Sequence, residues 1–559
     1  MIKRLAALSL LALAACGERS PEYDVIIRGG MIYDGNGGEP YIGDVATSRD
    51  RVAAVGDLGD ATAILEIDAA GQAVSPGFIN VLSWSDESLL HDPRGMSVLK
   101  QGVTLEVMGE GWSMGPLTEE MRAELLRNQS DIMFDVPWTT FGEYLQHLED
   151  TGVSVNVASF VGAKTLRIHQ IGYDDRPPTD EEMATMQDLV RQAMEEGALG
   201  VGSALIYPPA TFASVDELTA LATAAGEYGG GYITHMRSEG DRFLEGIEET
   251  ITIARDAGTW GQIYHFKPAG QNNWSKHADG IAMLEAARAE GIDMTANIYT
   301  YTAGATGLDV AFPPWSQEGG NEAWFERLAD PELRARIIEE MKDPNAGYEN
   351  LYLAAGSPEN VTLSGFDNPE LRHLTGKTLA EVAAMRGTSP EDTIVDLVLA
   401  DRSRVDAAYV LMSEENLKAN IAWPYMTFGS DGEAMAPEPP FTNRNPHPRT
   451  YGNFARLLGK FVREEKVITL QEAVCRLTTL SAENLRLKDR GCLNVGCYAD
   501  VVVFNPETIA ERATFAEPHQ YAVGVDTVLV NGVLTLEDGD FTGAGAGRFV
   551  KGPGYPGPR

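Results

Sequence analysis

Short apolar runs alternate with longer polar stretches of helical composition through the middle of the chain. Each run ends where glycine and polar residues begin, a pattern typical of buried parallel strands that are followed by helices. The runs are "AVSPGFINVLSW", "VTLEVMGEG", "VSVNVASFVGA", "GALGVGSALIY", "GGGYITHMR", "WGQIYHFK", "DMTANIYTYTAG" and "WPYMTFGSDG". Eight strand–helix units predict an α/β fold, a TIM (β/α)8 barrel over residues 75–488 with its active site at the carboxyl ends of the strands.

The two ends of the chain have a different pattern. Near the start, "YDVIIRGGMIYDGNG" and "GDVATSRDRVAAVGDLG" alternate β-rich runs with Gly, Asp and Asn turns. Near the end, "ADVVVFNPETI" and "VDTVLVNGVLTLEDG" do the same, and Asn531-Gly532 is typical of a hairpin turn. We expect residues 23–74 and 489–559 to form one small β-sandwich together.

A long connection, residues 302–423, separates the last two apolar runs. It contains "PPWSQEGGNEAWFERL" and helical stretches. Long connections at the mouth of a barrel are often lids, so we expect an inserted lid region here. The alternative is a helical excursion that packs on the side of the barrel.

The first residues have the pattern of a secretion signal. Lys3 and Arg4 precede an apolar segment that is too short for a membrane span of about 20 residues. Its end, Leu13-Ala14-Ala15-Cys16, resembles a bacterial lipobox, so we expect residues 1–15 to be removed, Cys16 to be lipidated and residues 16–22 to be a tether. An ordinary signal peptide with a chance cysteine is the alternative. Gly17 favours the outer membrane, with the protein facing the periplasm.

The net charge limits the classes of binding partner, and the cysteine positions allow one disulfide. The formal net charge of -38 argues against nucleic acids and anionic lipid surfaces, which leaves the lipid anchor as the expected membrane attachment. A homo-oligomer stays open. Cys492 and Cys497 are close enough to form a disulfide in an oxidising compartment, and two unpaired small residues are an equal alternative.

Polar side chains stand at the ends of several apolar runs. His235 ends "YITH" and His265 ends "QIYH", and histidines on neighbouring strand ends are better explained as zinc ligands than as separate structural residues. Glu110, in "VMGEGWSMGP", is the candidate third ligand, with Glu106 as its rival inside the run. Asp431, in "YMTFGSDGE", is a helix cap or a catalytic acid–base group.

Longer motifs resemble one family. "THMRSEGDRFLEGIEETITIARDAGTWGQIYHFKPAGQNNW", "YTYTAGATGL", "FPPWSQEGG", "LTTLSAENLRLKDRG" and "ATFAEPHQY" are similar to the D-aminoacylases, the N-acyl-D-amino-acid deacylases of the metal-dependent amidohydrolase superfamily. The likeness extends from about Tyr23 to Gly539. It implies a hydrolase that cleaves the amide bond of a small N-acyl amino acid, D-configured in the family, with metal-activated water.

The resemblance implies roles for individual residues. It implies a zinc ion bound by His235, His265 and, where the family usually has a cysteine, Glu110. Asp431 matches the catalytic base and acid. The residues matched to substrate contacts are Lys267 and Arg449, which hold a carboxylate, together with Tyr207. Tyr299 is a further candidate substrate contact. Trp315 and Trp324, in the region that covers the active site of the relatives, are expected to shape the acyl pocket.

The chain departs from the family pattern at two places. The first barrel strand of the superfamily typically ends in His-x-His, whereas "PGFINVLSWSDESLL" has Leu82 and Trp84 there, and neither can bind a metal. Those histidines belong to a second, weaker metal site, so we expect one zinc per chain. Lys164, in "FVGAKTLR", stands where the family usually has a histidine, and we place it among the substrate contacts. Its alternatives are a rim lysine packed along its stem and a carboxylated, metal-binding lysine.

The sequence leaves two other functions open. The protein is alternatively an amidase or peptidase that acts on a larger N-acyl or aryl amide. It is alternatively a non-catalytic binding lipoprotein on a decayed hydrolase barrel. The joint presence of His235, His265, Asp431, Lys267 and Arg449 counts against decay, because loss of function would not spare that set.

Overall fold

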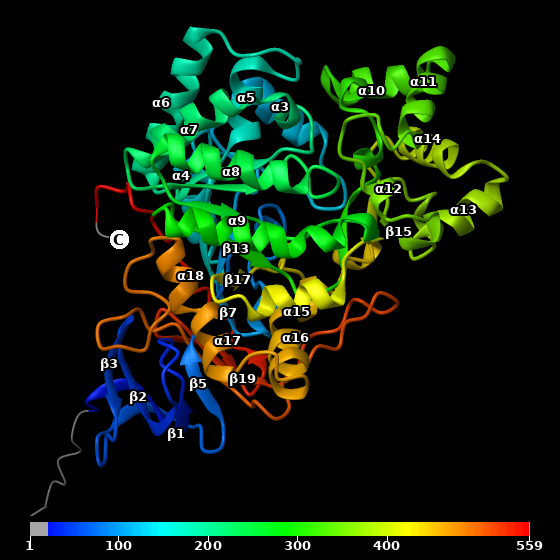
Figure 1. Ribbon diagram of the computed structural model, residues 1–559. Coiled ribbons are helices and arrows are strands. Elements are labelled where there is room, and N and C mark those ends of the chain that lie inside the picture. Colours follow the sequence, from blue (N-terminus) through cyan, green and yellow to red (C-terminus); the bar gives the residue numbers. More distant parts are fainter. Residues whose placement is uncertain (1–20, 558–559) are drawn as a thin grey trace, which may run out of the picture.

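The structure, a computed structural model, describes residues 21–557. The expected signal peptide and the lipidation site at Cys16 lie outside this part of the chain, as does most of the tether. Figure 1 shows a body of strands and helices, a lobe of green helices on one side of it, and the blue N-terminal strands at one end. No helix within residues 21–557 is long and apolar enough to cross a membrane.

The body contains two parallel sheets. The larger has the strand order β17-β13-β12-β11-β10-β9 and the smaller the order β6-β7-β8. Their strands are β6 (Phe78–Asn80), β7 (Val103–Met108), β8 (Asn156–Ser159), β9 (Val161–Gly162), β10 (Gly200–Ala204), β11 (Gly231–His235), β12 (Gly261–Ile263), β13 (Met294–Ile298) and β17 (Met426–Phe428). Their residues are buried throughout, which explains why the strands read as continuous apolar runs.

The two sheets meet at both margins. Only Phe160 separates β8 from β9. On the other side, the Val81 amide donates to the Phe428 carbonyl over 3.4 Å, and Ser83 forms a parallel bridge with Gly432. All eight apolar runs contain strands, but the hydrogen bonds define two sheets where we expected one closed eight-stranded barrel.

Helices follow the strands and cover the sheets. They include α4 (Phe141–Thr151), α5 (Ala163–Ile171), α6 (Asp180–Glu196), α7 (Val215–Gly226), α8 (Phe243–Ala257), α9 (His277–Ala289), α17 (Leu470–Leu477) and α18 (Thr479–Asn484). Helix α6 shows how the sequence sets the boundaries: Thr179 and Glu182 form a capping box at its start, and Gly197, with φ 114°, ends it.

Both chain ends contribute to a third sheet, of nine strands. It joins β1 (Tyr23–Ile32), β2 (Tyr41–Ser48), β3 (Arg51–Gly56), β4 (Ala63–Asp68) and β5 (Ala73–Pro76) to β18 (Val501–Phe504), β19 (Val525–Val530), β20 (Val533–Glu537) and β21 (Asp540–Phe541). The link is the antiparallel pair β5 and β18. Asn531 and Gly532 turn between β19 and β20 with positive φ, as their sequence predicts. A disulfide joins Cys492 to Cys497, and Cys475 is free.

Residues 302–423 form a lobe with its own sheet, which we call the insertion lobe. The antiparallel strands β14 (Ala303–Gly307), β16 (Asp406–Val410) and β15 (Val361–Gly365) lie beside α10 (Gly320–Ala329), α11 (Pro331–Lys342), α12 (Leu351–Ala354), α13 (Leu379–Arg386), α14 (Pro390–Asp401) and α15 (Glu414–Ala422). Figure 1 shows α10, α11, α13 and α14 to one side of the body. Trp324 packs against Phe312 and Phe325 inside the lobe.

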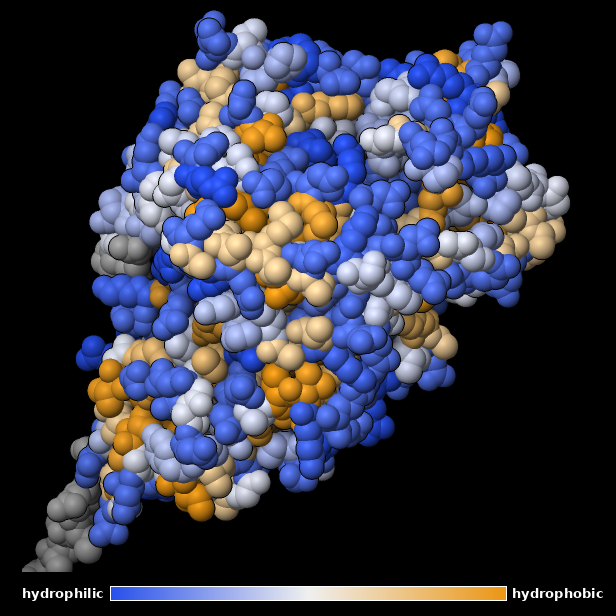
Figure 2. Space-filling view, viewed as in Figure 1, coloured by the Kyte–Doolittle hydropathy of each residue, from blue (hydrophilic) through white to orange (hydrophobic). Residues whose placement is uncertain are grey.

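The visible surface agrees with the strongly acidic composition. Figure 2 shows a largely hydrophilic face that is interrupted by separate hydrophobic patches. Among the large apolar residues that stay exposed are Ile42, on β2, and Ile64, on β4. Single exposed apolar residues are common on soluble domains and need no special account.

Candidate metal centre and active-site cavity

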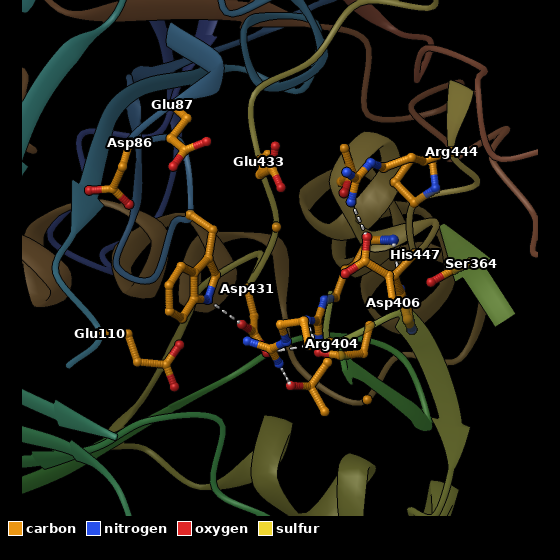
Figure 3. A pocket seen from close by; sticks show the side chains of 18 of the residues that line it. Asp86, Glu87, Glu110, Ser364, Arg404, Asp406, Asp431, Glu433, Arg444 and His447 are labelled. Carbon is orange, nitrogen blue, oxygen red and sulfur yellow. Dashed lines mark hydrogen bonds and ion pairs between the residues drawn. The ribbon is translucent and has the colours of Figure 1, made fainter. Parts of the chain in front are cut away.

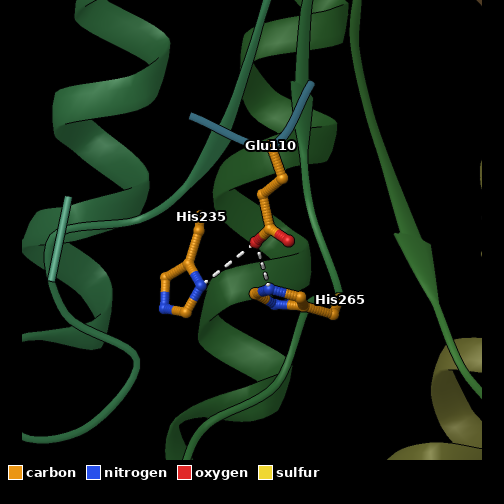
Figure 4. Close-up of side chains that lie close together, drawn as sticks. All are labelled: Glu110, His235 and His265. Carbon is orange, nitrogen blue, oxygen red and sulfur yellow. Dashed lines mark hydrogen bonds and ion pairs between the residues drawn. The ribbon is translucent and has the colours of Figure 1, made fainter. Parts of the chain in front are cut away.

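Glu110, His235 and His265 meet at the carboxyl ends of their strands. His235 is the last residue of β11, and Glu110 and His265 each follow the end of their strand, β7 and β12, by two residues. Glu110 Oε1 lies 3.2 Å from His235 Nδ1 and 2.9 Å from His265 Nε2. One ligand atom from each residue lies within 4.8 Å of the other two, and all three side chains are buried (Figure 4).

The chemistry of this cluster fits a divalent metal ion. Two imidazoles and one carboxylate are a ligand set of catalytic zinc sites. Burial raises the pKa of the Glu110 carboxyl, but the neighbouring His265 and His235 outweigh it and hold that pKa at about 2. The carboxylate is therefore ionised, as a metal ligand must be. Glu106, the rival ligand, lies within β7 instead, where Asn80 donates to its carboxylate over 3.1 Å.

A carboxylate that the sequence analysis did not single out supports the cluster. Glu239 Oε1 lies 2.8 Å from His265 Nδ1 and accepts from Lys267 Nζ over 2.6 Å. Burial acts against its charge, but Lys267 and both histidines hold the pKa of Glu239 well below its usual range. Glu239 thus fixes the His265 ring, as carboxylates behind metal-binding histidines commonly do. Its position four residues after His235 was the available signal.

Asp431 lies three residues beyond β17, in the same cavity. The indole N–H of Trp84 donates to its Oδ1 over 3.1 Å, and Arg449 Nη1 lies 2.8 Å from its Oδ2. Burial raises the pKa of Asp431, although Arg449 opposes this. Its backbone φ of 51° is in the left-handed region, which residues other than glycine rarely adopt. The carboxylate is therefore held in one orientation by both of its oxygens.

The predicted substrate-binding residues line this same cavity, whose volume is about 710 Å³. The Arg449 guanidinium lies 4.5 Å from the centre of the Tyr299 ring. Its Nε atom is buried and has no hydrogen-bond partner in the described part of the chain, whereas its Nη1 atom forms the ion pair with Asp431. Tyr207 is hydrogen-bonded to Thr306 over 2.8 Å, and its ring contacts that of His235 at 5.6 Å. Lys267 instead makes its contacts with Glu239 and His265.

Lys164 also lines the cavity, as the second residue of α5. Burial, and next the charge of Arg404, lower the pKa of this lysine to about 8. Within residues 21–557 its ammonium group makes no ion pair. Trp315 and Trp324 are absent from the cavity lining, so the expectation that they shape the substrate pocket is wrong. The insertion lobe reaches the cavity through other residues, among them Thr306 and Arg404.

Leu82 and Trp84 occupy the positions where the superfamily typically has His-x-His. Leu82 is fully buried in a core cluster with Ile79 and Val81. Trp84 lines the cavity and directs its indole N–H at Asp431. Neither side chain offers a metal ligand. This corner of the cavity is therefore built to hold Asp431 by a hydrogen bond.

Comparisons with known proteins agree with this geometry. Residues 65–536 match the model of the amidohydrolase family. The chain is 34% identical to the D-aminoacylase of Alcaligenes xylosoxydans xylosoxydans over 535 residues, 95% of this chain and 98% of that protein. A D-aminoacylase structure described as having a binuclear metal centre, with one-metal activation and second-metal attenuation, superposes with a TM-score of 0.78 at 32% identity, covering 95% of this chain and 100% of the other.

A second solved structure carries ligands. The N-acyl-D-glutamate deacylase of Bordetella bronchiseptica, in complex with zinc and a phosphonate inhibitor, superposes with a TM-score of 0.78 at 30% identity, covering 95% of this chain and 99% of that one. The chain therefore belongs to the amidohydrolase family. Within that family it is an atypical member of the D-aminoacylases, a metal-dependent hydrolase of amide bonds that lacks the His-x-His motif.

Proposed function

We propose that the protein hydrolyses the amide bond of N-acyl amino acids, of the D configuration as in the names of its relatives, at a single zinc ion. The observation that carries the proposal is one cavity that contains the buried cluster of Glu110, His235 and His265 together with Asp431. A single ion is proposed because Leu82 and Trp84 replace the ligands of a second one. When bound, zinc supplies Lewis acidity, which lowers the pKa of water and polarises an amide carbonyl.

Asp431 is the proposed general base and acid. It takes a proton from the attacking water and delivers it to the nitrogen of the leaving amine. Its burial and its raised pKa suit a group that must hold a proton between these two steps. Trp84 and Arg449 leave the carboxylate little freedom to rotate, so the proton is carried at a defined position.

Arg449 and Lys267 are the proposed anchors of the substrate α-carboxylate. The buried Nε atom of Arg449 lacks a hydrogen-bond partner among the described residues, and a substrate carboxylate would accept a hydrogen bond from it. Nη1 already lies 2.8 Å from Asp431 Oδ2. Tyr299 lies beneath the guanidinium and fixes its plane. Tyr207 and Lys164 are proposed substrate contacts elsewhere in the cavity.

The finer architecture and the location of the protein are also proposals. The contacts at both margins of the two parallel sheets support one closed eight-stranded barrel. The lipobox supports an anchor at Cys16 and an outer-membrane protein that faces the periplasm. Cys16→Ser should release the protein from membranes or block its processing. Unchanged membrane fractionation would contradict the anchor.

The enzymatic proposal is tested with a panel of N-acetyl amino acids in both configurations, each compared with its carboxamide. Turnover should require the zinc-loaded protein and should favour the free carboxylate by about tenfold or more, since an arginine–carboxylate pair is strong. Equal turnover of acid and carboxamide would argue for an amidase or peptidase. No turnover of any member by zinc-loaded protein would overturn the proposal.

A further inference from the structure

Three carboxylates of the cavity make no ion pair within residues 21–557. Nine acidic residues line the cavity: Asp86, Glu87, Glu110, Asp131, Glu239, Asp367, Asp406, Asp431 and Glu433. Six lie against a basic side chain, among them Asp131 at 2.8 Å from Arg372, and Asp367 and Asp406 against Arg444. Asp86, Glu87 and Glu433 form no ion pair with residues 21–557, and the charge of Arg444 acts on Glu87 and Glu433 only from beyond ion-pair distance.

These three residues, which we call the acidic wall, come from two loops. Asp86 and Glu87 follow Trp84 after β6, and Glu433 follows Asp431 after β17. Figure 3 shows them together on the side of the cavity away from Arg444 and Asp406. They differ in depth, because Glu87 is exposed, Glu433 is partly buried and Asp86 is only 6% exposed.

Asp86 is the observation that points to a ligand. Its side chain lines the cavity, and its Oδ1 is fully buried with no hydrogen-bond partner in the described chain. Burying an ionised carboxylate without a partner is costly, so such groups are normally paired or protonated. Burial, and next the charge of Glu87, raise the pKa of Asp86 to about 7. A cationic ligand would remove this cost.

The geometry and neighbours of the wall select an organic cation over a metal ion. A calcium or magnesium site needs several oxygens around one point. Among the His, Cys, Asp and Glu side chains of the described residues, only those of Glu110, His235 and His265 bring three ligand atoms within 4.8 Å of one another. Two tryptophans, Trp84 and Trp112, line the same cavity. Carboxylates beside aromatic rings are typical of sites for ammonium and guanidinium groups.

We propose that the acidic wall binds an ammonium or guanidinium group of the substrate. The preferred substrates are then N-acyl amino acids that carry a cation in addition to their α-carboxylate. This inference rests on the proposed function, because it assumes that Arg449 and Lys267 hold the carboxylate. The cation belongs either to the amino-acid side chain or to the acyl group, and matched substrates separate these sources.

The test uses zinc-loaded enzyme and two pairs of substrates of equal shape. N-acetyl-lysine is compared with N-acetyl-norleucine, and β-alanyl-norleucine with butyryl-norleucine, in both configurations. At least one cationic member should exceed its neutral partner by about tenfold or more in kcat/KM, as expected for a partly buried charge pair. The pair that shows the preference identifies the source of the cation.

Isosteric variants then assign the effect to the wall. Asp86→Asn and Glu433→Gln should each reduce the cationic preference severalfold, and together should bring the ratio close to one. Asp131→Asn is the matched control, because Asp131 lines the same cavity but already pairs with Arg372. The control should keep the ratio. Zinc content and melting temperature show whether each variant is folded.

The outcomes separate this inference from the proposed function. Hydrolysis of the neutral members as fast as the cationic ones overturns the inference and leaves the proposed function intact. If no member is hydrolysed, the proposed function fails, and calorimetric titration with free lysine and norleucine decides the inference alone. Binding of both with equal affinity, or of neither, overturns it. Calcium binding that the Asp86→Asn and Glu433→Gln variants abolish, without binding of lysine, also overturns it.

Discussion

In one part of the cavity six carboxylates lie against basic groups, whereas in another part three carboxylates, those of the acidic wall, make no ion pair within residues 21–557. Glu110 lies between His235 and His265, and Asp431 contacts Arg449. Asp86, Glu87 and Glu433 have no comparable partner within residues 21–557. Both sides belong to the same 710 Å³ cavity.

The difference shows which carboxylates are neutralised by basic groups of the protein itself. We call the part of the cavity with paired carboxylates the balanced side and the acidic wall the unbalanced side. The balanced side keeps its geometry before substrate arrives, and preorganised charge is what catalysis at such a site requires. On the unbalanced side, burial and the charges of nearby acids, opposed by Arg444, raise the pKa of Glu433 to about 8. Such a surface is stabilised by a counter-charge from outside the chain.

The largest effect is expected from Glu110→Ala, which breaks the balanced side. Only two histidine ligands would remain, so zinc content should fall below about half an equivalent and turnover by about a thousandfold or more. Elemental analysis and kcat/KM measure the two losses. Glu106→Gln is the control and should keep its zinc, because Glu106 lies within β7. Full zinc content in Glu110→Ala would show that the β7 loop is only structural.

Asp431→Asn separates proton transfer from metal binding. The amide keeps the shape of the side chain but cannot accept the proton, so kcat should fall about 10²–10⁴-fold while zinc content stays at the wild-type level. Metal analysis and turnover on the same sample give the comparison. Loss of zinc in parallel with loss of turnover would make Asp431 a ligand and reverse its role.

The sequence predicted the elements better than their assembly. All eight apolar runs contain strands, because burial on both faces leaves a continuous hydrophobic signal. How the two parallel sheets meet depends on hydrogen bonds between residues that are distant in sequence, such as Val81 and Phe428, and no local pattern encodes them. The prediction that Trp315 and Trp324 shape the substrate pocket was wrong, because the sequence of an insertion does not distinguish an aromatic residue that lines a pocket from one that packs inside the lobe.

The candidate site was predictable where strand ends carry a distinctive residue. His235, His265, Glu110 and Asp431 follow strands directly, so the fold brings them together. Glu239 was missed although it lies four residues after His235, and the acidic wall was missed because a carboxylate in a loop is most often solvated and only its surroundings show otherwise. The hydrogen bond from Trp84 to Asp431 joins residues 347 positions apart and could not be read from either segment.

Trp84→Phe tests the hydrogen bond to Asp431, which lies between the balanced side and the acidic wall. Phenylalanine keeps most of the ring but removes the N–H that bonds to Asp431 Oδ1, so kcat should fall about tenfold to a hundredfold while KM and zinc content change little. The pH profile of kcat should shift as well, because Asp431 loses a donor that favours its charged form. Trp112→Phe is the control, since the Trp112 indole makes no hydrogen bond in the described chain. Equal effects of both variants would show that Trp84 acts through packing and not through its hydrogen bond to Asp431.

The smallest effect concerns Lys164, the cavity cation that lacks an ion pair within residues 21–557. Its pKa is about 8 in the folded protein, against a usual value of 10.5. Below pH 8 the folded protein must bury this charge, so Lys164→Met should raise the free energy of unfolding by about 1–2 kcal/mol at pH 7. Between pH 8 and 10.5 the unfolded chain binds the extra proton, so the wild type gains stability as pH rises and the difference should vanish. Denaturant titrations of both proteins across this range measure it, with Lys418→Met, a surface change expected to stay within about 0.5 kcal/mol, as the control. A stabilisation that does not depend on pH would assign the effect to packing and not to the charge.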